Sequence, residues 1–192
     1  GFIQPVVDPP GWFAGEKNKI RRLRQTQCHI NTALYTLYEY QKTYVAHLVD
    51  VCLAAEKRRA GQGQAYAYVA TGQGKTLIAM ALVAALRVPA CFIVPTIALQ
   101  GDGVKEANRA LPGLKTVAYS NALEKKLEKR GEAPPRAANV DILYCVVNTA
   151  REKPPEFFEG FGIIFFDEAH EYHSPASSRL MWTAQAPCIV GL

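Results

Sequence analysis

The chain has 192 residues, of which 49% are hydrophobic and 20% are charged. This composition excludes an intrinsically disordered chain and fits one globular domain large enough to bury its own core. The formal net charge is +5, which weakly favours a polyanionic partner such as nucleic acid. No signal peptide is recognisable, and no apolar run reaches the roughly 18 residues of a membrane span, so we expect no membrane partner.

The five cysteines predict buried free thiols rather than a metal centre. Their number is odd, none forms a CxxC pair, and several lie in apolar runs where a thiol behaves as a small hydrophobe. No second ligand pair at zinc spacing accompanies the neighbouring Cys28 and His29. The pattern favours a reducing, intracellular compartment. The cysteines are Cys28, Cys52, Cys91, Cys145 and Cys188.

Residues 1–37 are expected to form an N-terminal basic extension ahead of the main domain. They hold several prolines, turn glycines and a basic run from Lys17 to Arg24. That run either contacts phosphates or forms a solvated face, and the sequence leaves both interpretations open. The main domain is expected over residues 38–192. Because the chain starts with Gly and stops inside an expected strand, we expect it to be a segment of a longer protein.

In chain order, the main domain begins with a helix expected over residues 38–60, where apolar residues recur at spacings of three and four. Short apolar runs and helical patterns then alternate. Strands are expected over 65–70, 90–94, 116–119, 141–147, 162–166 and 186–192. Helices are expected over 75–86, 97–111, 121–130 and 177–184.

This alternation predicts an α/β fold in which helices cover both faces of a parallel sheet. The run Ile163–Phe166 is apolar at every position, as a strand buried on both faces requires. The charged helix expected over 121–130 is either a solvated helix or a wedge that contacts nucleic acid, and both interpretations stay open.

A glycine-rich turn between a strand and a helix predicts a phosphate-binding site. Glycines at two of its positions let backbone amides point inward, and the following helix N-terminus adds to the anion site. The lysine can reach the β- and γ-phosphates of a nucleotide, and the last hydroxyl can ligate Mg²⁺. Val69 stands where the strict P-loop pattern has a glycine, so the match is incomplete. The residues are Thr71, Gly72, Gln73, Gly74, Lys75 and Thr76.

An acidic pair follows the buried run that ends at Phe166. Ligands of parallel sheets bind at the carboxyl ends of the strands, where Asp167 and Glu168 are expected to lie. Asp167 is predicted to hold Mg²⁺, and Glu168 to orient or deprotonate an attacking water. His170 is interpreted either as a polar relay between the nucleotide and nucleic-acid sites or as a structural histidine.

Taken together, the TGQGKT turn at 71–76 and the Asp-Glu-Ala-His run at 167–170 resemble motifs I and II of superfamily 2 helicases and translocases. The resemblance covers roughly residues 38–192. It implies a P-loop NTPase with a RecA-like fold, of which this chain holds one lobe. It also implies ATP and Mg²⁺ as cofactors, nucleic acid as a partner, and a second RecA-like lobe outside this sequence. One lobe alone is expected to bind nucleotide and to hydrolyse it weakly, because transition-state charge stabilisation is incomplete.

Weaker matches fall in the order that the family uses. Gln41 is similar to the glutamine that reads adenine, although an exposed helix glutamine is the other interpretation. Pro95 and Thr96 resemble motif Ia, which holds a nucleic-acid phosphate near a helix N-terminus, and Thr96 can equally be a helix N-cap. Thr149 lies where the family places another contact to the nucleic-acid backbone, and a plain loop residue is the alternative.

The resemblance implies an ATP-dependent helicase or duplex translocase. DNA is favoured as the substrate because Leu77-Ile78-Ala79-Met80, directly after motif I, is more similar to double-strand translocases than to RNA helicases. An RNA helicase of the same superfamily is the second interpretation. A nucleotide-binding module without catalysis is the third, and Glu168 argues against it because such a module needs no water-orienting carboxylate.

Overall fold

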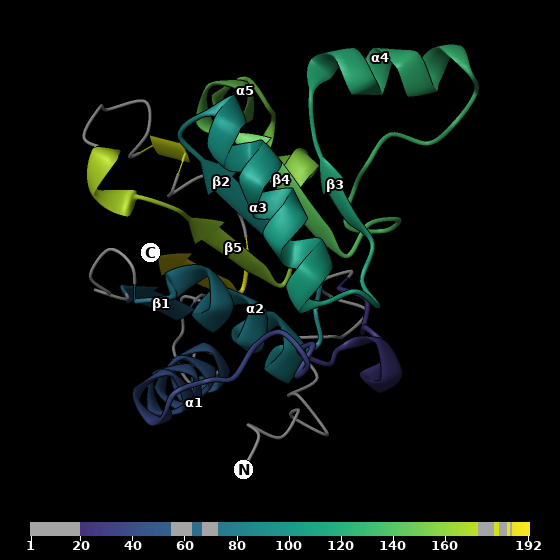
Figure 1. Cartoon of the computed structure of the whole chain (residues 1–192). Coiled ribbons are helices and arrows are strands. Elements are labelled where there is room, and N and C mark those ends of the chain that lie inside the picture. The colour runs from purple at the N-terminus through teal and green to yellow at the C-terminus, as the bar shows by residue number, and fades with distance from the viewer. Residues whose placement is uncertain (1–19, 55–62, 67–72, 173–178, 181–183, 185) are drawn as a thin grey trace.

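The computed structural model describes residues 20–54, 63–66, 73–172, 179–180, 184 and 186–192. In this part of the chain, a six-stranded sheet has the strand order β1-β6-β5-β2-β4-β3 (Figure 1). Every strand pairing is parallel, so the predicted α/β fold with a parallel sheet is confirmed. The strands are β1 (Gly63–Tyr66), β2 (Ala90–Val94), β3 (Thr116–Ala118), β4 (Ile142–Val146), β5 (Ile163–Phe166) and β6 (Cys188–Gly191).

Helices connect the strands, and several begin and end where the sequence predicts. The helix α2 matches its predicted bounds, and its residues from Ile78 to Leu86 are all buried. A helix that is apolar on every side has to be enclosed by other elements, and α2 packs against both α1 and α3. The α-helices are α1 (Glu39–Ala54), α2 (Lys75–Leu86), α3 (Ile97–Ala110), α4 (Asn121–Lys129) and α5 (Val147–Arg151).

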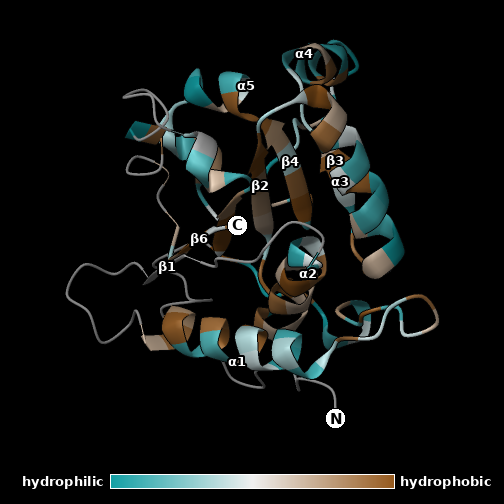
Figure 2. Cartoon of the chain, turned by 60° about the vertical axis from the view of Figure 1, so that its left-hand side comes forward, coloured by the Kyte–Doolittle hydropathy of each residue, from teal (hydrophilic) through white to brown (hydrophobic). Residues whose placement is uncertain are grey.

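Each central strand sends alternate side chains into two separate apolar cores. Phe92 of β2 packs with the side chains that face α1, α2 and α3. Its neighbour Ile93 packs on the opposite face, with Phe157 and Phe158 of the 3₁₀ helix η3 (Pro155–Phe158). Both faces are therefore covered, as predicted, and Figure 2 shows β2 and β4 in the apolar colour of the scale.

The chain departs from the predicted elements after β4. The strand ends at Val146, and α5 begins at Val147. The predicted strand was one residue longer at this end, and no helix was predicted after it. Val147 and Ala150 are buried on one side of this short helix. Tertiary packing, rather than a local pattern, therefore determines that the chain forms a helix here. Most of the helix expected over 177–184 lies outside the described residues.

The described part of the N-terminal region packs onto the main domain. Arg21 donates hydrogen bonds to the backbone oxygens of Ala137 (2.7 Å) and Val140 (2.5 Å) and forms an ion pair with Asp141 (2.5 Å). Leu23 is buried, and its N–H donates to the Arg87 carbonyl at 2.8 Å. At Arg21, therefore, the basic run is anchored to the protein itself. Lys17 and Lys19 lie outside the described residues.

The structure corrects the expectation for two of the cysteines. Cys52 of α1 and Cys188 of β6 form a disulfide across a sequence separation of 136 residues, with a Cα–Cα distance of 5.4 Å. Cys28, Cys91 and Cys145 are buried free thiols, as predicted. No pattern in the sequence indicates the pairing, because α1 and β6 become neighbours only after the intervening strands are assembled. The cysteine pattern therefore no longer indicates a reducing compartment.

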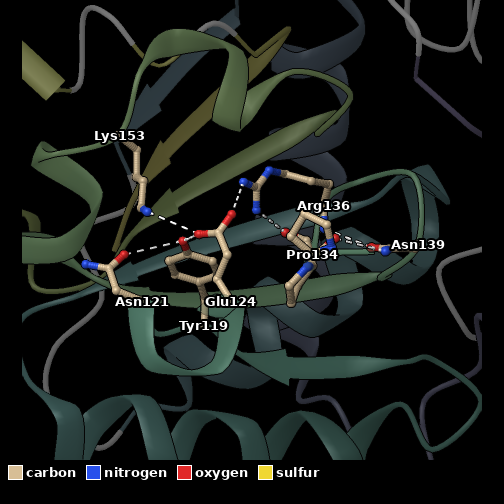
Figure 3. A network of polar contacts seen from close by, with 8 residues as sticks. Tyr119, Asn121, Glu124, Pro134, Arg136, Asn139 and Lys153 are labelled. Carbon is tan, nitrogen blue, oxygen red and sulfur yellow. Dashed lines mark hydrogen bonds and ion pairs between the residues drawn. The ribbon is translucent and has the colours of Figure 1, made fainter. Parts of the chain in front are cut away.

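The helix α4 is held to the rest of the domain by one carboxylate (Figure 3). Glu124 accepts a hydrogen bond from Arg136 at 2.5 Å and pairs with Lys153 at 3.3 Å. The Tyr119 hydroxyl donates to the same carboxylate, and the Arg136 guanidinium lies 4.7 Å from the centre of the Phe157 ring. The opposite side of α4 carries exposed charged residues.

We expect Glu124→Ala to lower the free energy of unfolding by about 2 to 3 kcal/mol, because it leaves two partly buried cations without their counterion. The exposed Glu128→Ala on the same helix is the matched control, with an expected change within about 0.5 kcal/mol. Urea unfolding at neutral pH measures both values. Equal losses for the two variants would show that the Glu124 network does not stabilise the fold.

The cost of Glu124→Ala is also expected to depend on pH. Burial alone would raise the pKa of Glu124, but the hydrogen bonds and charges of Arg136 and Lys153 outweigh it and lower that pKa below its ordinary value of 4.5. A carboxyl whose pKa is lowered by folding stabilises the folded state above its unfolded-state pKa. The difference between wild type and variant should therefore shrink as the pH falls below 4.5, in urea titrations repeated at acidic pH.

Candidate nucleotide site

The predicted phosphate loop leads directly into the N-terminus of α2. Gly74 precedes the helix with φ of 77° and ψ of 36°, a left-handed conformation that glycine adopts without steric cost. A Cβ at this position would lie 2.6 Å from the Gln41 amide nitrogen, so the Gln41 side chain would have to shift. Lys75 and Thr76 form the first turn of α2, where free backbone N–H groups favour an anion. Thr71 and Gly72 lie outside the described residues.

Lys75 lies against the acidic pair at the end of β5. Its ammonium forms an ion pair with Glu168 and lies 3.4 Å from Asp167 Oδ1. Asp167 follows β5 directly, and its backbone N–H donates to the Ile93 carbonyl at 2.9 Å, which fixes it beside the end of β2. Segments that are more than 90 residues apart in the chain therefore meet at one edge of the sheet.

The ammonium of Lys75 lies beside two carboxylates, and this arrangement changes the pKa values of the cluster. Burial raises the pKa of Asp167, although the charge of Lys75 opposes the shift. Burial lowers the pKa of Lys75, but its hydrogen bond to Glu168 and the charge of Asp167 outweigh burial and raise that pKa above its usual value. Lys75 therefore stays protonated at neutral pH and is available as a phosphate partner.

The backbone at Glu168 is left-handed, with φ of 52° and ψ of 46°. This conformation is unfavourable for a residue with a side chain and occurs most often at functional sites. The Glu168 N–H donates to Asp167 Oδ1 at 3.1 Å. His170 lies 3.5 Å from the other Glu168 oxygen, and its imidazole is largely exposed. This contact is compatible with both interpretations of His170.

Gln41 connects α1 to the phosphate loop. Its amide nitrogen donates to the Gln73 carbonyl at 3.1 Å, and its amide oxygen accepts from the Tyr38 N–H at 2.9 Å. Its exposed fraction is 2%, which excludes the interpretation of Gln41 as an exposed helix glutamine. The Tyr40 hydroxyl donates to the same Gln73 carbonyl at 2.9 Å. The Tyr40 contact was not predicted, because it joins two residues that lie 33 positions apart in the chain and no local pattern indicates it.

The residues predicted to contact nucleic acid lie at the same edge of the sheet as the acidic pair. Pro95 and Thr96 follow β2, and Thr149 lies on α5, directly after β4. The Thr96 hydroxyl accepts a hydrogen bond from the Leu99 N–H at 3.2 Å, so Thr96 is the N-cap of α3. Thr96 is also exposed, so the N-terminus of α3 is still accessible to a ligand although Thr96 caps the helix.

One buried polar side chain that shapes this edge was not predicted from the sequence. Gln100 of α3 donates from its amide nitrogen to the backbone oxygens of Tyr119 and Tyr144, each at 2.8 Å. It thereby fixes α3 against the ends of β3 and β4. A single glutamine in an amphipathic helix gives no pattern by which its burial could be predicted.

Among the residues that the structure describes, no helix is both long and apolar enough to cross a membrane. The family described as "Type III restriction enzyme, res subunit" matches residues 34–192. This match covers all the described strands and all the described residues of the nucleotide site.

Sequence relatives come from African swine fever virus. The protein named "Putative ATP-dependent RNA helicase QP509L" of isolate Tick/South Africa/Pretoriuskop Pr4/1996 is 35% identical over 158 residues, which cover 82% of this chain and 28% of that protein. The protein of the same name from strain Badajoz 1971 Vero-adapted is also 35% identical over 158 residues, or 82% of this chain and 29% of that protein. The chain therefore spans only a part of the length of these relatives.

A solved structure shares the fold. The "Sulfolobus solfataricus SWI2/SNF2 ATPase core in complex with dsDNA" superposes with a TM-score of 0.65 at 17% sequence identity, over 82% of this chain and 32% of that chain. The likeness confirms the predicted RecA-like fold of a single lobe.

Proposed function

Because the chain belongs to the family of the Type III restriction enzyme res subunit, we propose that it is the ATP-binding lobe of a nucleic-acid-stimulated motor. The observation that carries the proposal is the contact of Lys75, at the N-terminus of α2, with Asp167 and Glu168 at the end of β5. The hydrolysis of a nucleoside triphosphate requires a cation, free helix amides and two carboxylates, here at one edge of a parallel sheet.

The residues present fit a magnesium nucleotide. Thr76 and Asp167 line the same cavity, and hydroxyl and carboxylate oxygens are the donors that Mg²⁺ prefers. Thr76 and Asp167 would hold the ion, while Gln73, Gly74 and Lys75, together with Thr71 and Gly72, would bind the phosphates. When bound, the magnesium ion neutralises charge that develops on the phosphates.

We infer that nucleotide binding exchanges the partners of Lys75. Without nucleotide, the ammonium is neutralised by Asp167 and Glu168. The phosphates of ATP would compete for the same ammonium, which frees Glu168 from its ion pair. Glu168 would then accept the proton of the attacking water or orient that water. His170, 3.5 Å from Glu168, would relay the state of the nucleotide site to the nucleic-acid side.

Gln41 is proposed to read the adenine base. Its amide uses one N–H and one lone pair within the chain, so one N–H and one lone pair remain for the base edge. Because Gln41 also holds the Gln73 carbonyl of the phosphate loop, adenine recognition and phosphate binding would be coupled through one side chain.

Nucleic acid is proposed to bind along the edge that holds Pro95, Thr96 and Thr149, where the N-terminus of α3 suits a phosphate. We keep DNA as the proposed substrate, because Leu77–Met80 is similar to double-strand translocases and the RecA-like neighbour was solved with double-stranded DNA. RNA is the second candidate, because the viral relatives are named RNA helicases. An intracellular location follows from either substrate.

The substrate is tested by ATP turnover of the full-length protein with single-stranded DNA, duplex DNA and RNA at equal nucleotide concentration. We expect duplex DNA to give the largest stimulation. Stimulation by RNA alone would replace the DNA assignment by the RNA assignment. Turnover that no nucleic acid changes would instead support a nucleotide switch without motor activity.

A further inference from the structure

A cavity of about 260 Å³ adjoins the candidate magnesium site. Thr76 and Asp167 lie on its wall toward the nucleotide, and Phe92 and Tyr144 line it from the sheet. Asp102 and Glu106 of α3 contribute carboxylates to its lining. The cavity therefore lies between the proposed metal ligands and α3.

Tyr144 lines this cavity, and its hydroxyl is buried and has no partner within the part of the chain that the structure describes. The exposed fraction of Tyr144 is 2%. A buried hydroxyl without a hydrogen bond destabilises the folded state. Such groups are rare in folded proteins, and each calls for an explanation such as a bound water or a functional role.

The ring of Tyr144 is fixed by its neighbours. It stacks on Phe92 with the ring centres 4.6 Å apart and the planes at 12°. Gly103 of α3 covers the ring so closely that a Cβ there would lie 2.3 Å from Tyr144 Cε1. The ring is therefore held in place, and any partner of the hydroxyl must come to it.

The hydroxyl can act only as a neutral donor or acceptor. Burial raises the pKa of Tyr144 far above its usual value, and the charges of Asp167 and Glu106 raise it further. A neutral tyrosine hydroxyl can donate one hydrogen bond and can also accept. A cation polarises the O–H bonds of a water that it holds, so such a water acts as a donor. The hydroxyl oxygen of Tyr144 is therefore a suitable acceptor for a water of this kind.

We propose that Tyr144 is a positioning residue of the magnesium site, whose hydroxyl oxygen accepts a hydrogen bond from a water held by the bound cation. Mg²⁺ keeps several waters when proteins bind it, and a cavity that reaches Thr76 and Asp167 has room for them. The inference rests on the proposed function, because it assigns a residue to the same magnesium nucleotide.

The test compares Tyr144→Phe with Tyr119→Phe by calorimetric titration of a non-hydrolysable ATP analogue, with Mg²⁺ and with EDTA. Tyr144→Phe should lower the Mg²⁺-dependent gain in affinity about tenfold, as the loss of an outer partner of a metal site does. Its affinity in EDTA should stay within about twofold of wild type, since the hydroxyl touches no phosphate. Its melting temperature should be unchanged or higher, because an unpaired buried hydroxyl is removed.

Tyr119→Phe is the matched control, because its buried hydroxyl is bonded to Glu124. It should lower the melting temperature and leave the Mg²⁺-dependent gain intact. A Tyr144→Phe variant with the wild-type gain, or with only a lowered melting temperature, would overturn the assignment of Tyr144. If wild type itself shows no Mg²⁺-dependent gain, the proposed nucleotide site fails first and the assignment of Tyr144 fails with it.

Discussion

Replacement of Glu168 by glutamine is expected to lower ATP turnover by about 10²- to 10⁴-fold, the usual contribution of a general base. The amide keeps the size of the side chain and its hydrogen bond to Lys75, but it cannot accept a proton from water. Nucleotide affinity should therefore stay within about threefold of wild type. Turnover is measured by phosphate release from the full-length protein, and affinity by titration with a non-hydrolysable analogue.

The control for this variant is Glu156→Gln, an exposed glutamate of η3 outside the site. It removes the same charge and should change neither turnover nor affinity. A Glu168→Gln protein that turns over ATP at the wild-type rate would contradict the role of Glu168. A loss of affinity equal to the loss of turnover would show that Glu168 acts in binding instead.

Replacement of Lys75 by alanine is expected to raise the dissociation constant for Mg·ATP about 100-fold, equivalent to about 2.7 kcal/mol. The ammonium supplies charge-assisted hydrogen bonds to the phosphates, and no neighbouring cation in the described site replaces it. The same variant should also be less stable without nucleotide, because Asp167 and Glu168 lose their counterion. Affinity is measured by titration, and stability by thermal unfolding without nucleotide.

Lys126→Ala, an exposed lysine of α4, is the control for the loss of a positive charge. It should leave both the affinity and the melting temperature as in wild type. Wild-type affinity for Mg·ATP in Lys75→Ala would place the phosphates elsewhere on the protein and would contradict the nucleotide site.

Local sequence signals predicted the elements that position the site. The bounds of α2 and β2 agree with the prediction, because a glycine or a proline punctuates the chain before each of them and their apolar residues are continuous. The acidic pair was correctly expected at a strand end, because Asp167 follows four consecutive apolar residues. The family and its RecA-like fold were also predicted from the two motifs, and the comparisons confirm both.

Contacts between distant segments could not be predicted from the sequence. The bond from Gln41 to Gln73, the disulfide of Cys52 with Cys188 and the cavity around Tyr144 each join elements that meet only in the assembled sheet. No pattern of spacing indicates which side chains will share a cavity. These contacts determine how α1 holds the phosphate loop and how the magnesium side of the site is shaped.

The central claim is that a triphosphate binds at the N-terminus of α2 with its magnesium ion beside Asp167. A crystal structure of the chain with Mg²⁺ and a non-hydrolysable ATP analogue tests it directly. We predict phosphate oxygens on the amides around Gly74 and on Lys75, and a metal ion between Thr76 and Asp167. A nucleotide bound at another edge of the sheet, with Lys75 still paired to Glu168, would contradict the claim.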